Sequence, residues 1–270
     1  MRYWKGSIVL SPTRDQPLLR EVARSAFITH NQLFESLKLD YCASSRKGFN
    51  NRVLRLVNHG LLVRREGLIG SREVVYSVSS SGASALGGSE DRLVDPSGKA
   101  GSPGIQTLRH CLDLNEIHLA LKRTGSLVYW TSETEIRSRC DLTSYGYWKY
   151  YDAVVVVRLA GQDCKFALEY ERTPKAARQY VAIRERIEQE TAIRHFLYLV
   201  PNHDFMWFIA EKLSQCRRAV YVGLFQDFLE QNLALPVRRS GSPATLTLAS
   251  VLAPGKEAQH SGELFSGVAV

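Results

Sequence analysis

Apolar residues along the first third of the chain follow two different periods. They recur every three or four positions in three runs, which predicts helices over 18–25, 31–37 and 44–59. Thr29, with Gln32 three residues later, predicts a cap for the second helix. After a stop at Gly60, the run 61–66, a turn at 67–70 and alternating apolar positions at 74, 76 and 78 predict a β-hairpin. Three helices followed by a hairpin predict a winged helix-turn-helix.

The third predicted helix has two unlike faces. At about 100° per residue, Phe49, Val53, Leu56 and Val57 share one face. A recognition helix needs an apolar face for its own domain and a polar, basic face for the major groove. The residues predicted to contact DNA are Ser44, Arg46, Lys47, Asn51, Arg52 and Arg55 on this helix and Arg64, Arg65 and Arg72 on the hairpin. The alternative is a solvated face on a protein-interaction domain.

The later sequence alternates between strand-like and helix-like patterns. Strands are expected at 127–133, 150–159, 166–171, 195–200 and 219–224, and helices at 113–123, 174–194, 205–216 and 225–232. The strands at 150–159 and 166–171 are joined tightly, whereas the later ones have helical crossovers, so the sheet must be mixed. Trp130 and Trp207 lie in apolar runs and are expected in the core.

Two composition breaks divide the chain into units. Residues 87–107 are rich in Gly, Pro and Ser and predict a flexible linker. Residues from 236 to 270 have a similar composition and predict a loosely held, low-complexity tail. The expected organisation is therefore an α+β protein of two domains, 1–86 and 108–235.

The positive charge is concentrated in the first unit. The chain has a formal net charge of +8, and residues 1–88 hold 13 Lys and Arg against 6 Asp and Glu. This distribution favours double-stranded DNA as a partner. The five cysteines are scattered, which argues against a disulfide frame and for reduced thiols. No apolar run approaches the length of a membrane span, and no secretory signal is evident, so a cytoplasmic protein is expected.

Three acids flank the predicted hairpin of the second unit. Asp152 precedes the apolar run 153–157, and Glu169 and Glu171 close the partner strand. By the two-residue period of a strand, Glu169 and Glu171 point to the same side. Such carboxylates are exposed, paired with Arg172 and Lys175, or bound to a hard cation. Mg²⁺ or Mn²⁺ held there would suit phosphodiester cleavage.

The chain contains, in order, a helix with Glu116, a strand, Asp152 before an apolar strand, and Glu169-Tyr170-Glu171 before a helix. This order resembles the PD-(D/E)xK nuclease core of restriction endonucleases. More narrowly, His110, Asn115 and the string from Phe166 to Thr173 behind a winged helix are similar to the replication-relaxation family, which includes MobC-type plasmid mobilisation relaxases. The resemblance implies metal ligation by Asp152, Glu169 and Glu116. It also implies nicking of DNA, single-stranded DNA at the cut site, conjugation or replication proteins as partners, and allows a homodimer.

The chain departs from the nuclease pattern at the motif lysine, where Glu171 stands. That lysine stabilises the charged transition state, so its role is expected to pass to Lys175, or to Lys149 near Asp152. In the enzymatic interpretation, Glu171 orients the reacting groups or ligates the metal ion. The alternative is a catalytically inactive DNA-binding regulator or accessory factor that keeps the fold for assembly. The aromatic residues Tyr145, Tyr147, Trp148, Tyr150 and Tyr151 either stack unpaired bases or pack in the core, and packing is favoured.

Overall fold

The structure of the chain is a computed structural model that describes residues 8–42, 45–67, 73–86, 104–140 and 146–253. The N-terminal unit contains α1 (Asp15–Ser25), β1 (Ile28–Thr29), α2 (His30–Leu39), α3 (Arg46–Asn58), β2 (Leu62–Arg65), β3 (Val75–Val78) and α4 (Ser80–Ser84). The three strands pair in the order β1-β3-β2. The predicted order of three helices and then a hairpin is confirmed.

The ends of these helices follow from local sequence. The Thr29 side chain accepts a hydrogen bond from the Gln32 backbone N–H and the Gln32 side chain accepts one from the Thr29 N–H, so the predicted capping box is present. Ser45 caps α3 by accepting from the Gly48 N–H. Gly60, just beyond α3, has a φ of +70°, which a glycine adopts without a steric penalty.

Both faces of strand β3 are covered. Tyr76 packs with the helices of the N-terminal unit. Its neighbour Val75, on the other face, is fully buried against Leu108 and Leu112. The alternation seen in the sequence identified only the first face, because the second is covered by a helix from far along the chain.

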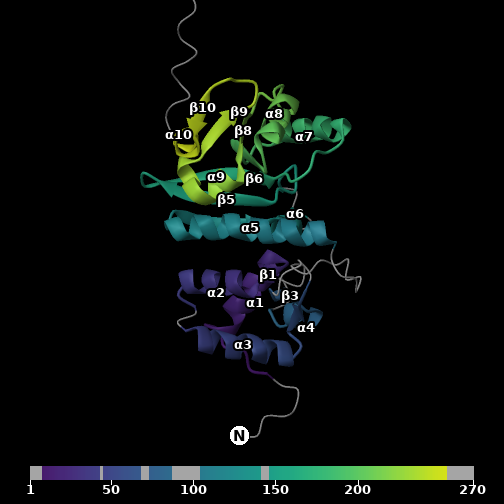
Figure 1. Cartoon of the computed structure of the whole chain (residues 1–270), viewed down its shortest axis with the longest axis vertical. Helices are drawn as coiled ribbons and strands as arrows, with labels where there is room; N and C mark the ends of the chain where they lie inside the picture. The colour runs from purple at the N-terminus through teal and green to yellow at the C-terminus, as the bar shows by residue number, and fades with distance from the viewer. Residues whose placement is uncertain (1–7, 43–44, 68–72, 87–103, 141–145, 254–270) are drawn as a thin grey trace, which may run out of the picture.

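That helix is α5 (Ile105–Thr124), which lies between the N-terminal unit and the large sheet (Figure 1). Asn115 donates to the backbone oxygen of Phe27 over 2.8 Å, and Gln32 donates to that of Leu112 over 2.9 Å. The helix starts earlier than the predicted range 113–123, and its first turn lies within the predicted linker 87–107. Residues 87–103 lie outside the described part.

The second unit is a seven-stranded mixed sheet with helices on both faces. Its elements are β4 (Leu127–Ser132), α6 (Glu133–Cys140), β5 (Ala153–Leu159), β6 (Gln162–Tyr170), α7 (Ala177–Gln189), β7 (His195–Val200), α8 (His203–Lys212), β8 (Ala219–Leu224), α9 (Phe225–Gln231), the 3₁₀ turn Asn232–Ala234, β9 (Pro236–Arg239), β10 (Thr245–Thr247) and α10 (Leu248–Leu252). The strand order is β10-β9-β8-β7-β6-β5-β4. Strands β5 and β6 are antiparallel, whereas β6, β7 and β8 are parallel, which confirms the predicted mixed sheet.

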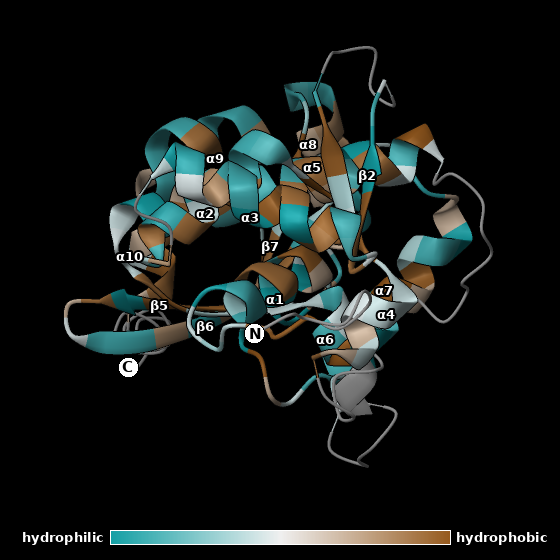
Figure 2. Ribbon diagram, turned by 90° about the horizontal axis from the view of Figure 1, so that it is seen from below, coloured by the Kyte–Doolittle hydropathy of each residue, from teal (hydrophilic) through white to brown (hydrophobic). Residues whose placement is uncertain are grey.

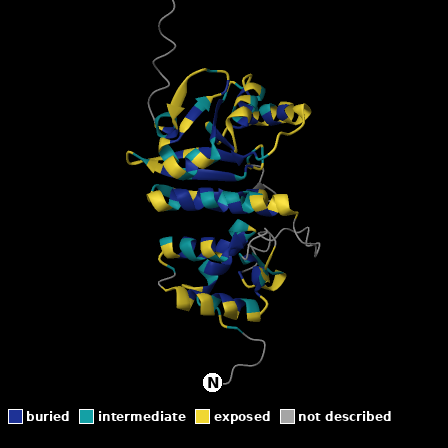
Figure 3. Cartoon of the chain, in the orientation of Figure 1, coloured by how far each residue is buried: buried dark blue, intermediate teal, exposed yellow. Residues whose placement is uncertain are grey.

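Two apolar cores lie on opposite faces of this sheet. One includes Ile117 of α5 and Phe228 of α9. The other includes Tyr180 of α7 and Ile209 of α8. Covered on both faces, the central strands are buried along most of their length (Figure 3). The continuous apolar run 153–157 is explained by this double burial.

The expectation of a loose tail from residue 236 is wrong for its first part. Residues 236–252 form β9, β10 and α10, which complete one edge of the sheet. Val237 is fully buried, and Leu248 and Leu252 are nearly so. A composition rich in Gly, Ser and Pro hid these few apolar anchors. Residues 254–270 lie outside the described part.

Smaller differences concern element ends and single side chains. The helix predicted at 174–194 is the shorter α7, and Glu133 begins α6 instead of ending a strand. Trp130 is buried as predicted, but Trp207 is 51% exposed, with the Arg238 guanidinium 3.8 Å from its ring centroid. The described thiols, Cys42, Cys111, Cys164 and Cys216, are all free. No helix among the described residues has the length and apolar character needed to span a bilayer.

Candidate functional site

The acids predicted from the sequence meet at one end of strands β5 and β6. Ala153 pairs with Leu168, so Asp152 and Glu169 lie opposite each other just beyond this pair. Glu171 follows the end of β6, and its N–H donates to the Leu199 oxygen. Glu169 and Glu171 are 5% and 3% exposed. Charges buried to this extent require partners.

Each of these two glutamates is paired with a lysine. The Lys149 ammonium contacts the Glu169 carboxylate, and the Lys175 ammonium contacts the Glu171 carboxylate. Lys149 is the more enclosed lysine, with a side chain 11% exposed against 39% for Lys175. The pairing of Glu169 with Arg172, one of the alternatives drawn from the sequence, does not occur, because Arg172 contacts Asp113 at 3.4 Å.

Asp152 is held by two hydrogen-bond donors. His110 Nε2 lies 3.2 Å from one carboxylate oxygen, and the Tyr170 N–H donates to the other over 2.7 Å. Burial alone would raise the pKa of Asp152, but His110, the Tyr170 N–H and the Lys149 charge together hold the pKa below its usual value. Burial works against His110 as well, and the neighbouring Asp152 outweighs it, so the pKa of His110 is raised.

Glu169 shows the opposite behaviour. Burial raises its pKa to about 7; the Lys149 ammonium lowers it, and the Asp152 charge raises it. Tyr198 is paired with Glu169 across β6 and β7, and its hydroxyl is a buried group without a hydrogen-bond partner among the described residues. Burial, followed by the Glu169 and Glu171 charges, raises the pKa of Tyr198.

The raised pKa of Glu169 predicts a pH-dependent stability difference. Between its unfolded value of 4.5 and about 7, the folded protein binds more protons than the unfolded chain, so the contribution of Glu169 to stability is lost as the pH rises. The Glu169→Gln variant lacks this titration. Urea denaturation is expected to show the variant gaining stability relative to wild type between pH 5 and pH 8. A stability difference that is the same at both pH values would contradict the assigned pKa.

Glu116 is not part of this cluster, which corrects its predicted role as a metal ligand. Its carboxylate accepts a hydrogen bond from Gln32 over 2.7 Å and lies 4.0 Å from Arg123. At about 100° per residue, Glu116 is roughly 120° around α5 from His110 and roughly 40° from Leu112, so it faces the N-terminal unit. The helix supplies His110 to the cluster instead. The sequence pointed to His110 only as one of the residues similar to the replication-relaxation family, without an assigned role.

The donor set in this arrangement does not fit a divalent cation. Such ions are bound by carboxylate oxygens, and a cation that already lies beside those oxygens repels them. Here the Lys149 ammonium contacts the Glu169 carboxylate. Among the described residues, no group of three or more His, Cys, Asp or Glu side chains is placed to hold a metal ion.

The predicted DNA-contacting residues divide into two groups. Lys47 and Asn51 are exposed on the outward face of α3, and neither has an ion pair or hydrogen bond among the described residues. Figure 2 views the molecule from the end occupied by α3. The buried residues of this helix are Phe49, Val53 and Leu56, as the sequence predicted.

Most of the predicted arginines that the structure describes are engaged within the protein. Arg52 and Arg55 pair with the fully buried carboxylate of Asp15, and Arg64 pairs with Glu66 at 2.5 Å. Arg46 donates to Asn31 over 2.6 Å and lies over the Phe34 ring, and Arg65 is half-buried. Arg55, which the sequence predicts to contact DNA, is thus paired with Asp15 and keeps a side chain that is 44% exposed. Ser44 and Arg72 lie outside the described residues.

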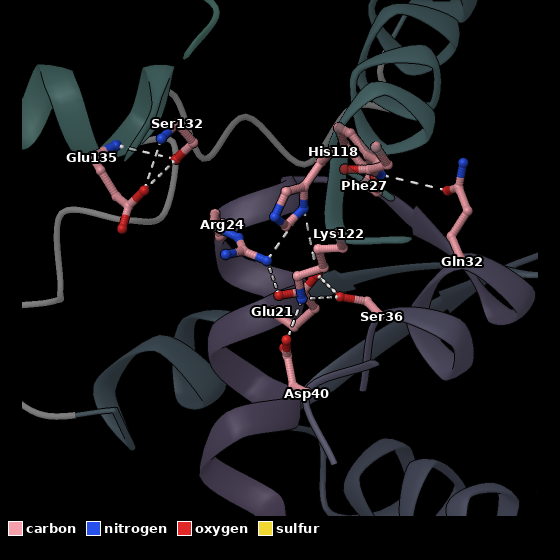
Figure 4. A network of polar contacts seen from close by, with 11 residues as sticks. Glu21, Arg24, Phe27, Gln32, Ser36, Asp40, His118, Lys122, Ser132 and Glu135 are labelled. Carbon is pink, nitrogen blue, oxygen red and sulfur yellow. Dashed lines mark hydrogen bonds and ion pairs between the residues drawn. The ribbon is translucent and has the colours of Figure 1, made fainter. Parts of the chain in front are cut away.

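A buried polar network joins the N-terminal unit to α5 (Figure 4). Lys122 donates to Ser36 over 2.8 Å and to Asp40 over 2.6 Å, and Ser36 donates to Glu21. Arg24 pairs with the same Glu21. Because α5 also carries His110, this one helix connects the unit with α3 to the carboxylate cluster.

The aromatic cluster is partly packed and partly exposed. Tyr151 is fully buried and Tyr147 packs beside the same core, as favoured from the sequence. Trp148 and Tyr150 are 56% and 43% exposed. Tyr145 lies outside the described residues.

Comparisons with known proteins found few similarities. No protein-family model and no curated protein match the chain. A solved structure of the restriction endonuclease FokI bound to DNA aligns with a TM-score of 0.26 at 13% sequence identity. The alignment covers 81% of this chain and 44% of the FokI chain, so this chain spans less than half of that protein.

Proposed function

We propose that this chain is a duplex DNA-binding protein. In this proposal, its N-terminal unit is a winged helix that places α3 in the major groove, and its sheet unit is a nuclease-like domain that does not cut. The observation that carries it is the outward face of α3, where Lys47 and Asn51 are exposed without partners among the described residues. Asn reads adenine through two hydrogen bonds, and Lys contacts guanine or phosphate.

The surroundings of α3 support this role. The helix is fixed to its own domain by Phe49, Val53 and Leu56 and by the ion pairs of Arg52 and Arg55 with Asp15. These arginines therefore position the helix, and the base contacts fall to Lys47 and Asn51. Residues 1–88 contain 13 basic and 6 acidic residues, and this surplus of positive charge favours a polyanionic partner.

Substitutions on α3 test this proposal. Full-length protein is used to select a site from random duplex DNA, and Asn51→Ala is then expected to weaken binding to that site by about 1 to 3 kcal/mol and to relax its sequence preference. Lys47→Ala is expected to lower affinity and the salt dependence of binding. Fluorescence anisotropy at two salt concentrations measures both.

The matched control is Lys165→Ala, which removes an exposed lysine from β6 of the other unit. It is expected to bind like wild type. Wild-type preference in Asn51→Ala, or equal losses in Lys47→Ala and Lys165→Ala, would mean that α3 is not the recognition element.

The competing function is metal-dependent nicking, with Asp152 and Glu169 as ligands of Mg²⁺ or Mn²⁺. The convergence of these two acids favours it. Against it count the pairing of Glu169 with Lys149 and the position of Glu116 on the other side of α5. The pairing of Lys175 with Glu171 also removes the lysine assigned to replace the motif residue. A plasmid-nicking assay separates the two functions.

A role in plasmid mobilisation or replication relaxation rests on the sequence resemblance alone. The same holds for single-stranded DNA, a homodimer and conjugation or replication proteins as partners. Binding duplex DNA without cutting it fits a regulator or accessory factor.

A further inference from the structure

We propose that the ammonium of Lys149 takes the place of a divalent cation between Asp152 and Glu169. The cluster would then be a cation site filled by a side chain of the same protein, and removal of Lys149 would open it to a metal ion. The proposed function assigns no cutting to this cluster. Occupation of the cluster by Lys149 does not depend on whether the protein binds DNA.

Lys149 lies among the groups that would surround a bound cation. Its ammonium contacts the Glu169 carboxylate, is close enough to Asp152 to favour the ionised form of that acid, and lies 5.1 Å from the Tyr151 ring centroid. Residue 149 belongs to an irregular segment just before β5, so the chain delivers this lysine from outside the sheet. A lysine is a compact point charge on a flexible stem, which suits it to fill a cation site.

The charges of the cluster balance without a metal ion. Asp152, Glu169 and Glu171 are matched by Lys149, Lys175 and the hydrogen-bonded His110. A divalent ion added to this arrangement would lie beside an ammonium, and the repulsion between like charges is strong at such distances away from water. Without Lys149, Asp152 and Glu169 would face each other with one cation fewer.

An unpaired hydroxyl provides an independent sign that the cluster accepts a polar occupant. Tyr198 is fully buried next to Glu169, and its oxygen has no hydrogen-bond partner among the described residues. A buried hydroxyl normally has a partner. The Tyr198 hydroxyl can therefore form a hydrogen bond with a ligand, and no described side chain uses this hydrogen bond.

The test is a titration of the full-length protein with Mn²⁺ alone, followed by calorimetry and by thermal unfolding. Wild type is expected to show neither heat of binding nor a shift in Tm at millimolar Mn²⁺. Lys149→Met is expected to bind one Mn²⁺ at least ten-fold more tightly than wild type and to gain several degrees in Tm. Lys149→Arg, which keeps the charge, and Lys175→Met, which leaves Lys149 in place, are expected to show, like wild type, no Mn²⁺ binding and no shift in Tm on adding Mn²⁺.

Adding Glu169→Gln to Lys149→Met is expected to abolish the gained site. If Lys149→Met does not fold without metal, it is refolded in the presence of Mn²⁺. Lys149→Gln then serves as a second variant for the same comparison with wild type. Wild type that binds Mn²⁺ as tightly as the Lys149 variants would overturn the inference. So would folded Lys149 variants that gain no binding. Neither result would change the expected loss of duplex binding in Asn51→Ala.

Discussion

A chain that ends after Leu235 is expected not to fold. The truncation removes β9, β10 and α10, and with them Val237, Leu248 and Leu252, which are 0%, 1% and 4% exposed. Removing one large core side chain costs about 2 to 5 kcal/mol, and a domain is stable by only about 5 to 15 kcal/mol. The loss of these side chains and of the paired edge strand exceeds that margin. Circular dichroism and soluble yield after expression measure the outcome.

The matched control ends after Ala253 and removes only residues outside the described part. This chain is expected to retain the wild-type Tm within error. A cooperative unfolding transition in the chain ending at Leu235, with a Tm near that of wild type, would show that β9, β10 and α10 are dispensable.

The substitution Lys149→Met is expected to cause a large loss of stability. It leaves the Glu169 carboxylate, which is buried, without its ammonium. Breaking a buried ion pair from one side costs about 3 to 5 kcal/mol. The loss should be larger at pH 8 than at pH 5, because the pKa of Glu169 is already about 7 with Lys149 present and rises further without it. Protonated Glu169 at pH 5 needs no cation.

Urea denaturation in metal-free buffer measures this loss. Glu169→Gln in the Lys149→Met background is expected to restore most of the stability at pH 8, because it removes the orphaned charge. Arg158→Met, which breaks the exposed pair with Asp163 on the same hairpin, is expected to leave stability unchanged within error. Equal effects of Lys149→Met and Arg158→Met would contradict the buried pairing of Lys149.

The elements that the sequence predicted well have strong local signals. Strands at 195–200 and 219–224 match β7 and β8 in both ends, because each is a short apolar run bounded by helix signals. The convergence of Asp152 and Glu169 followed from the tight connection between two β-branched strands. The Thr29 capping box likewise depends on residues three positions apart.

The features that could not be predicted depend on contacts between distant segments. Arg55 has the position of a base-reading residue, but its partner, Asp15, comes from another helix. Glu116 matches the expected acid of the first helix in type and order, and only the packing of α5 against Gln32 shows that it faces away from the cluster. Composition concealed β9 and β10, because a strand added to a sheet edge can be short and mostly exposed.

The central claim is that the protein binds duplex DNA through α3 and leaves it intact. Wild type is incubated with Mn²⁺ and a supercoiled plasmid that contains the selected site, and the plasmid is run on a gel before and after removal of protein. We expect a retarded plasmid that returns to the supercoiled position, and no retardation with the Lys47→Ala, Asn51→Ala double variant. Conversion of the plasmid to the open-circular form by wild type, lost in Asp152→Ala, would contradict the claim and identify a metal-dependent nuclease.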